Sequence, residues 1–198
     1  MPDATATSRG LLLIISGPSG VGKTTIAHRV ERALDAVFSI SVTTRAPGPG
    51  DRPGVDYHFI SEDEFAARRD AGDLLEWAQV FGHHYGTPRQ PVEECLAAGR
   101  VMILEIDVQG AIQVKSRLPE AFALFILPPS EQVLLDRLRH RRRDDEAAIQ
   151  RRFAKAKEEI ARAKASGIYD AFIVNDDLER AVQEAIDRVQ AELRRRQA

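Results

Sequence analysis

Residues 11–24 read LLLIISGPSGVGKT, an unbroken apolar run that ends in a glycine-rich loop. An apolar run of this length, bounded by glycine, predicts a strand buried on both faces of a parallel sheet. Beyond the loop, Ile26, Val30 and Leu34 recur on one helical face, which predicts a helix over residues 22–34. The stretch therefore predicts a strand, a tight loop and a helix in direct succession.

The loop matches G-x-x-x-x-G-K-[ST] without a gap, in the strand-to-helix position where this pattern binds phosphate. Backbone N–H groups of such a loop converge on phosphate oxygens, and its glycines permit the close approach. We expect the lysine to reach the terminal phosphates of ATP and the threonine hydroxyl to bind Mg²⁺. The alternative is a chance glycine-rich turn. The predicted ATP-binding residues here are Gly17, Pro18, Ser19, Gly20, Val21, Gly22, Lys23 and Thr24, with Thr24 as the Mg²⁺ ligand.

The remaining chain predicts an α/β fold of the P-loop NTPase type, with a parallel sheet flanked by helices. Strands are expected at 38–43, 101–106, 122–127 and 172–174, and helices at 88–98, from 109, at 130–140, 146–165 and 177–196. Residues 38–90 break this rhythm, because strands at 57–60 and 74–80 and a helix at 62–71 are crowded around a Gly- and Pro-rich loop at 45–56. This stretch is expected to be an inserted α/β subdomain.

Bulk properties indicate an ordinary globular protein. The chain has 198 residues, a formal net charge of −2 and one cysteine, Cys95. The near-neutral charge argues against a dedicated nucleic-acid binder, and no apolar run is long enough to cross a membrane. Residues 1–9 lack an apolar signal core and are expected to be a flexible leader. A single cysteine cannot form an internal disulfide, and together with the features above it predicts a cytoplasmic location.

Six short strings follow the loop: Ser41–Pro47, Asp56–Phe59, Leu75–Ala78, Tyr85–Thr87, Glu105–Gly110 and Val174–Asp177. In this order they resemble the guanylate kinase family, and the similarity extends over residues 10–190. The resemblance implies a P-loop kinase domain at 10–190, with core segments 10–37, 99–128 and 165–190, a GMP-binding insert at 38–90, a helical lid at 137–153 and a helix end at 191–198. It implies transfer of the γ-phosphoryl group of Mg·ATP to GMP or dGMP in purine nucleotide metabolism.

The resemblance also implies an acceptor site. Guanine presents N1–H and an exocyclic amine on one edge, and a carboxylate accepts from both donors. By similarity, the GMP-binding residues are Glu76 and Asp107 for the base, Ser41 and Thr87 near its O6, and Arg45, Tyr57 and Tyr85 for the phosphate. Other readings stay open: Glu76 as a surface acid, the two tyrosines as packed aromatics and Arg45 as a solvated loop residue. His83 and His84 are expected in a loop at the pocket rim.

An arginine-rich segment follows residue 136. It is either a solvated helix face or a lid whose cations neutralise charge on a transferred phosphoryl group. By resemblance Arg137, Arg141 and Arg152 face phosphate, and the catalytic set is Lys23, Arg45, Arg137, Arg141 and Arg152. The same resemblance adds Arg137, Arg141 and Asn175 to the ATP site, with the Asn175 segment against adenine.

One position departs from the family pattern Arg-x-Pro-Arg-x-Gly-Glu. Here Gly48 replaces the second arginine, and Arg52 lies four residues further along the same loop. Two alternatives to the kinase assignment remain: a P-loop kinase for another phosphorylated acceptor, and a non-catalytic guanylate-kinase-like binding module. The sequence leaves the oligomeric state and the choice between GMP and dGMP open.

Overall fold

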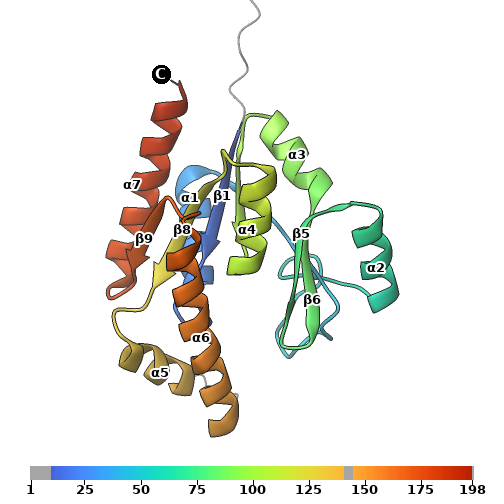
Figure 1. Cartoon of the computed structure of the whole chain (residues 1–198). Helices are drawn as coiled ribbons and strands as arrows, with labels where there is room; N and C mark the ends of the chain where they lie inside the picture. Colours follow the sequence, from blue (N-terminus) through green and yellow to red (C-terminus); the bar gives the residue numbers. More distant parts are fainter. Residues whose placement is uncertain (1–9, 141–144, 198) are drawn as a thin grey trace, which may run out of the picture.

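The apolar run at residues 11–16 is the central strand of a parallel sheet in the computed structural model, which describes residues 10–140 and 145–197 (Figure 1). This strand, β1 (Leu11–Ser16), lies between β7 (Val101–Glu105) and β8 (Phe122–Leu127). β2 (Val37–Phe38) and β9 (Ala171–Val174) form the edges, so the order is β2-β7-β1-β8-β9 with every neighbouring pair parallel. The predicted α/β fold with a parallel sheet is confirmed.

Helices cover both faces of this sheet, which explains why β1 is apolar at every position. Leu11, Leu13 and Ile15 pack in one core cluster with α1 (Lys23–Leu34) and α7 (Leu178–Gln197). Leu12 and Ile14 point to the other face, toward α3 (Arg89–Ala97) and α4 (Val108–Arg117). Successive side chains of a strand alternate between faces, so a sheet buried on both sides requires continuous hydrophobicity.

A separate four-stranded sheet has the order β4-β3-β6-β5. Its strands are β3 (Val42–Thr43), β4 (His58–Phe59), β5 (Leu74–Val80) and β6 (His83–Pro88), and α2 (Glu62–Asp70) packs beside them. The Ser61 hydroxyl caps α2 by accepting from the Glu64 N–H at 3.1 Å, as the Ser61–Glu64 spacing predicts. Phe65 of α2, Val42 and Leu74 form the small core of this part.

Two sequence expectations were wrong in this region. The single strand expected at 38–43 is divided, because β2 pairs with β7 of the parallel sheet whereas β3 pairs with β4 and β6 of the second sheet. The loop expected at His83 and His84 is strand β6, paired antiparallel with β5 through a turn at Phe81 and Gly82. Both turn residues have positive φ, 50° and 84°, as two-residue hairpin turns of the primed type require.

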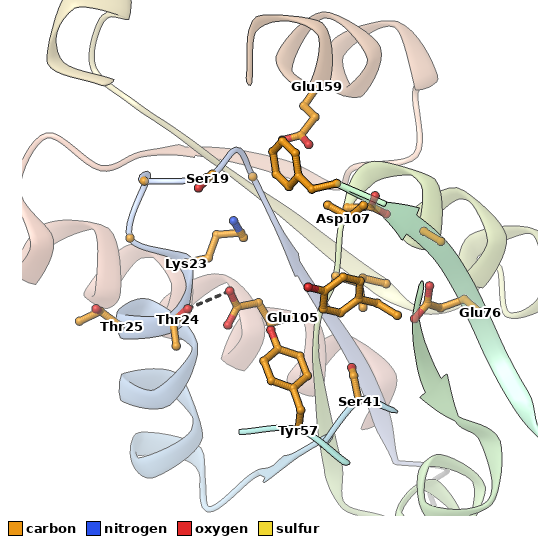
Figure 2. Close-up of a pocket in the computed structure, with 18 residues that line it drawn as sticks. Ser19, Lys23, Thr24, Thr25, Ser41, Tyr57, Glu76, Glu105, Asp107 and Glu159 are labelled. Carbon is orange, nitrogen blue, oxygen red and sulfur yellow. Dashed lines mark hydrogen bonds between the residues drawn. The ribbon is translucent and has the colours of Figure 1, made fainter. Parts of the chain in front are cut away.

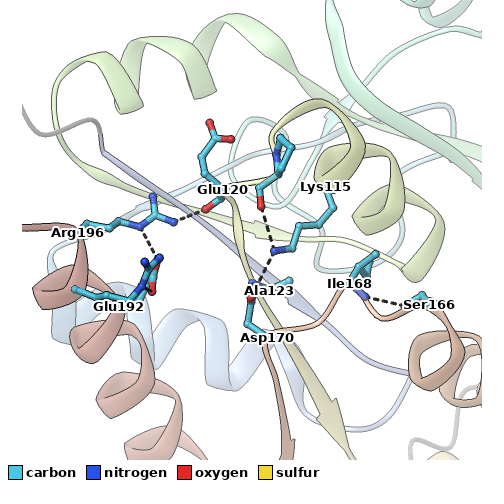
Figure 3. A network of polar contacts seen from close by, with 10 residues as sticks. Lys115, Glu120, Ala123, Ser166, Ile168, Asp170, Glu192 and Arg196 are labelled. Carbon is cyan, nitrogen blue, oxygen red and sulfur yellow. Dashed lines mark hydrogen bonds and ion pairs between the residues drawn. The ribbon is translucent and has the colours of Figure 1, made fainter.

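Contacts at one end of the molecule join α7 to the parallel sheet (Figure 3). Arg196 donates to the Glu120 carbonyl and, at 2.7 Å, to the Glu192 carboxylate. Nearby, Asp170 accepts from the Ala123 N–H at 2.7 Å and pairs with Lys115 at 3.0 Å. Residues 191–197 thus form the last part of α7, and Arg196 contacts the segment that leads into β8.

Two further helices, α5 (Glu131–His140) and α6 (Glu146–Ser166), follow β8. Residues 141–144 between them, which include Arg141, lie outside the described residues, as do the expected leader at 1–9 and Ala198. Phe38, which the expected boundary assigns to the insert, pairs with Ile103 in the parallel sheet. Among the described residues, none of the helices combines the length and apolar character needed to cross a membrane.

Candidate active site

The glycine-rich loop connects β1 to α1, and its glycines are needed where they stand. Gly22 is the N-cap of α1 with φ 96°, and a Cβ there would lie 2.6 Å from Asn175 Nδ2. Gly17 has φ 151°, and a Cβ there would lie 2.5 Å from the Ile126 carbonyl oxygen. Lys23, the first residue of α1, folds back so that its Nζ donates to the Pro18 carbonyl at 3.0 Å. The loop therefore has the backbone of a phosphate-binding nest at a helix start.

An acid that the sequence analysis assigned no role lies beside this loop. The parallel register of β1 and β7 places Glu105 opposite Ile15, at the ends of the two strands. Its Oε1 accepts from the Thr24 hydroxyl at 2.9 Å (Figure 2). The sequence gives only a weak indication of this role, because Glu105 is the single polar residue in the otherwise apolar strand VMILE and stands at its end.

Thr24 and Glu105 fit a Mg²⁺ ion of the P-loop type. Mg²⁺ is bound in such sites by a loop hydroxyl and one carboxylate, with phosphate oxygens and water supplying the other ligands. Within residues 10–140 and 145–197 no cluster of three or more His, Cys, Asp or Glu side chains is arranged around a metal position. The Thr24–Glu105 pair is accordingly the donor set that would hold the ion together with a bound nucleotide.

Two acids from different elements meet on the opposite side of the site. Glu76 of β5 is only 4% exposed and accepts from the Thr87 hydroxyl at 2.6 Å. Burial, and to a lesser degree the charge of Asp107, raise the pKa of Glu76 to about 7. Asp107 caps α4, its Oδ1 accepting from the Gly110 N–H at 2.8 Å. A Cβ on Gly110 would lie 2.4 Å from Glu76 Oε2, so the glycine makes room for this carboxylate.

An arginine and two phenols gather beside strands β3, β4 and β6 of the second sheet. The rings of Tyr57 and Tyr85 are 5.8 Å apart, and the Arg45 Cζ lies 5.4 Å from the Tyr57 ring centre. Burial is the main reason that the pKa of Tyr57 rises to about 12, which keeps its hydroxyl a donor at neutral pH. Arg45 also pairs with Asp51 at 2.8 Å, which holds the guanidinium beside the two rings.

One cavity of about 380 Å³ joins the glycine-rich loop to the two acids. In Figure 2, Lys23 and Thr24 lie on one side of it, Glu76 and Asp107 on the other, and Ser41 and Tyr57 below. The predicted site residues that line it are Gly17, Ser19, Gly20, Gly22, Lys23, Thr24, Ser41, Tyr57, Glu76, Tyr85 and Asp107. Those that do not line it are Pro18, Val21, Arg45, Thr87, Arg137, Arg152 and Asn175.

The residues predicted to form the lid and to lie near adenine contact other parts of the protein. Arg137 of α5 donates to the Asn175 carbonyl at 2.9 Å. Asn175 is 5% exposed, and its side-chain amide donates to the Val21 carbonyl at 2.8 Å. Asn175 therefore bridges the glycine-rich loop and α5. Arg152 of α6 lies over the ring of Phe81, with its Cζ 5.7 Å from the ring centre.

Two further cavity residues, Phe81 and Glu159, were missed by the sequence analysis. Phe81 belongs to a hairpin that was not predicted, and Glu159 is one acid among several on a charged helix. Neither has a local pattern that separates it from ordinary surface residues. Tertiary structure alone brings them to the site.

Comparison with known proteins agrees with this geometry. The family model described as guanylate kinase matches residues 9–192. The chain is 48% identical over 189 residues to the guanylate kinase of Myxococcus xanthus, covering 95% of this chain and 90% of that protein. It is 51% identical over 174 residues to the guanylate kinase of Thermosynechococcus vestitus, covering 87% and 90% respectively. A crystal structure of guanylate kinase from Anaplasma phagocytophilum is similar with a TM-score of 0.76 at 34% identity, over 93% of this chain and 87% of that one. Because these matches extend over nearly all of the chain, it belongs to the guanylate kinase family.

Proposed function

We propose that this protein transfers the γ-phosphoryl group of Mg·ATP to the phosphate of GMP within the cavity described above. The observation that carries the proposal is that one cavity is lined both by the glycine-rich loop and by the two acids Glu76 and Asp107. Phosphoryl transfer requires the two substrates to meet in line, and a shared cavity supplies that arrangement. A binding module would have no use for the loop lysine and threonine, which are both present.

The loop end of the cavity is assigned to ATP. Its backbone N–H groups and the start of α1 favour phosphate oxygens, and Lys23 supplies a mobile positive charge. Thr24 and Glu105 would hold Mg²⁺, which when bound offsets negative charge on the phosphates. Arg137 and Arg152 are assigned to the developing charge of the transferred group, together with Arg141 from the segment outside the described residues.

The acid end is assigned to guanine. Glu76 accepts from the N1–H and the exocyclic amine, and Asp107 accepts from the amine with the oxygen that does not cap α4. Ser41 lines the cavity and is assigned to guanine O6. Thr87 is fully buried, does not line the cavity and donates to Glu76, so we assign it to orienting that carboxylate.

The GMP phosphate is assigned to Arg45, Tyr57 and Tyr85. Phenol hydroxyls and a guanidinium are donors, and all three groups lie close together beside the second sheet. The attacking oxygen is already an anion, so no general base is required. Positioning and electrostatic stabilisation then account for the rate.

The test is a coupled assay of ADP release with GMP, dGMP, AMP, CMP and UMP as acceptors. GMP should exceed AMP by about 10⁴ in kcat/KM, because AMP presents an acceptor where the two acids need donors. Lys23→Ala should lower kcat by about 100-fold or more while leaving the fold intact. Equal turnover of AMP and GMP would overturn the guanine assignment, and a folded, active Lys23→Ala protein would overturn the mechanism. A chain with no turnover of any acceptor would favour the binding-module alternative.

A further inference from the structure

Phe81 occupies a backbone position that is unfavourable for a large apolar side chain. It is 56% exposed at the tip of the β5–β6 hairpin and has φ 50°, in the left-handed region. Large side chains are uncommon there, and glycine or asparagine would turn the chain with less strain. Strain and exposure of an aromatic residue at the rim of a reaction cavity point to a functional role.

The ring of Phe81 contacts another part of the molecule. Lys155 Nζ lies 4.3 Å from the ring centre, and the Arg152 Cζ lies 5.7 Å from it. Both distances are within the range of cation–π attraction. Arg152 and Lys155 are three residues apart on α6 and so share one face of this helix. Glu159, one turn further, lines the same cavity as Phe81, so this face of α6 is turned toward the site.

We propose that Phe81 is a positioning residue, which holds Lys155 and Arg152 of α6 toward the cavity and joins the acceptor-side sheet to this helix. In this role the hairpin tip and α6 enclose the transferred phosphoryl group together. Lys155 becomes a second cation of the site beside Arg152. The inference rests on the proposed role of Arg152 in phosphoryl transfer.

The test replaces Phe81 in two ways. Phe81→Asn removes the ring but keeps a residue that tolerates positive φ, whereas Phe81→Tyr keeps the aromatic face. We expect Phe81→Asn to lower kcat about fivefold with the KM for GMP changed less than about twofold, and Phe81→Tyr to retain nearly full kcat. Val55→Asn is the matched control, because Val55 is also an exposed apolar residue of the acceptor side, at 51%, and does not line the cavity. Thermal unfolding of each variant shows that the fold is kept.

A double-mutant cycle with Lys155→Gln identifies the partner. Lys155→Gln should lower kcat by a similar factor, and the double variant should lose no more than the larger single loss, since both changes break one contact. Full kcat in folded Phe81→Asn, or additive losses in the double variant, would overturn the inference. If the unaltered protein still phosphorylates GMP, such a result would contradict only the role of Phe81. If the unaltered protein does not turn over GMP, the proposed function itself would be wrong.

Discussion

At the scale of single residues, the loop at 45–56 differs most from the family pattern. Gly48 stands where the pattern has an arginine, and its N–H donates to Asp51 Oδ2 at 2.6 Å. Arg52, the nearby substitute considered from sequence, has a side chain that is 72% exposed and lies 3.5 Å from the Asp56 carboxylate. It lines neither the cavity nor the cluster around Arg45. This placement favours weaker phosphate binding over replacement by Arg52.

Gly48→Arg should therefore lower the KM for GMP. Gly48 does not have positive φ, and a Cβ there would lie 3.4 Å from Arg45 Nη1 and 3.3 Å from Asp51 Oδ2, so the Asp51 side chain must shift slightly to admit it. One added charge-assisted hydrogen bond at a partly wet site corresponds to about tenfold in KM. Arg52→Ala should change this KM by less than about threefold, as expected for a solvated charge. Steady-state kinetics with varied GMP measures both, and a large rise in KM for Arg52→Ala would instead identify Arg52 as the phosphate ligand.

Glu76 shows a conflict between function and stability. Its pKa is raised to about 7 in the folded protein from an ordinary value of 4.5, chiefly by burial. A carboxyl whose folded pKa lies above its unfolded pKa favours folding in its protonated form. That contribution is complete below the unfolded pKa and is lost as the pH rises through about 7.

Glu76→Gln should accordingly be more stable than the unaltered protein at pH 8, by on the order of 2 kcal/mol in the free energy of unfolding. The difference should shrink as the pH falls through about 7 and vanish below about 4.5, where Glu76 is protonated in the unfolded state as well as in the folded state. Urea unfolding at several pH values measures it. The same variant should lose GMP turnover while keeping ATP binding. A stability difference that grows on acidification would contradict the buried, protonated carboxyl.

At the scale of elements, the first turn of α4 assembles the end of the cavity that we assign to guanine. Asp107 caps the helix, and Gly110 both donates to Asp107 and leaves room for Glu76. One turn further, Gln113 accepts from the Trp77 N–H at 3.3 Å and donates to the Trp77 carbonyl at 2.6 Å. These contacts set the distance between α4 and β5. Asp107 is thus positioned by a helix that packs on the parallel sheet, and Glu76 by a strand of the second sheet.

Gly110→Ala should weaken the binding of GMP more than it lowers the stability of the fold. Alanine favours the helix by about 1 kcal/mol over glycine, but its Cβ would lie 2.4 Å from Glu76 Oε2 and must displace that carboxylate. We expect the KM for GMP to rise about tenfold or more while the KM for ATP changes less than about twofold. Ser116→Ala at the exposed end of α4 is the control. An unchanged KM for GMP in Gly110→Ala would show that the Glu76 position is not critical.

At the scale of the whole molecule, Asn175 connects segments that are far apart in sequence. It follows β9, its amide donates to Val21 in the glycine-rich loop, and its carbonyl accepts from Arg137 of α5. The carboxyl ends of parallel strands meet at one edge of the sheet, which is where ligands bind in such folds. Asn175 thus supports the glycine-rich loop and α5, the two segments that we assign to ATP.

Asn175→Ala should lower stability and weaken ATP binding together. The Val21 carbonyl would lose its buried donor, at about 1–3 kcal/mol in unfolding free energy. The loop and Arg137 would lose their common support, so the KM for ATP should rise severalfold more than the KM for GMP. Arg180→Ala, which removes a surface pair with Asp176, is the control. Unchanged KM for ATP would limit Asn175 to a role in folding.

Local patterns in the sequence determined the strand, loop and helix at residues 11–34, the parallel sheet and the cap at Ser61. Each of these depends on apolar periodicity, on glycine at positive φ or on a side chain that reaches a neighbour three residues away. Family resemblance added the residues at the two ends of the cavity.

Only the tertiary structure decided which distant residues meet. The division of residues 37–43 between two sheets depends on which strand each end pairs with, and local β propensity is the same on both sides of the break. Glu105 meets Thr24, 81 residues away, because β7 lies next to β1 in the sheet order. Phe81 meets α6 because a two-residue turn carries the hairpin tip across the cavity. Contacts of this kind are set by strand order and packing, which no local pattern of residues contains.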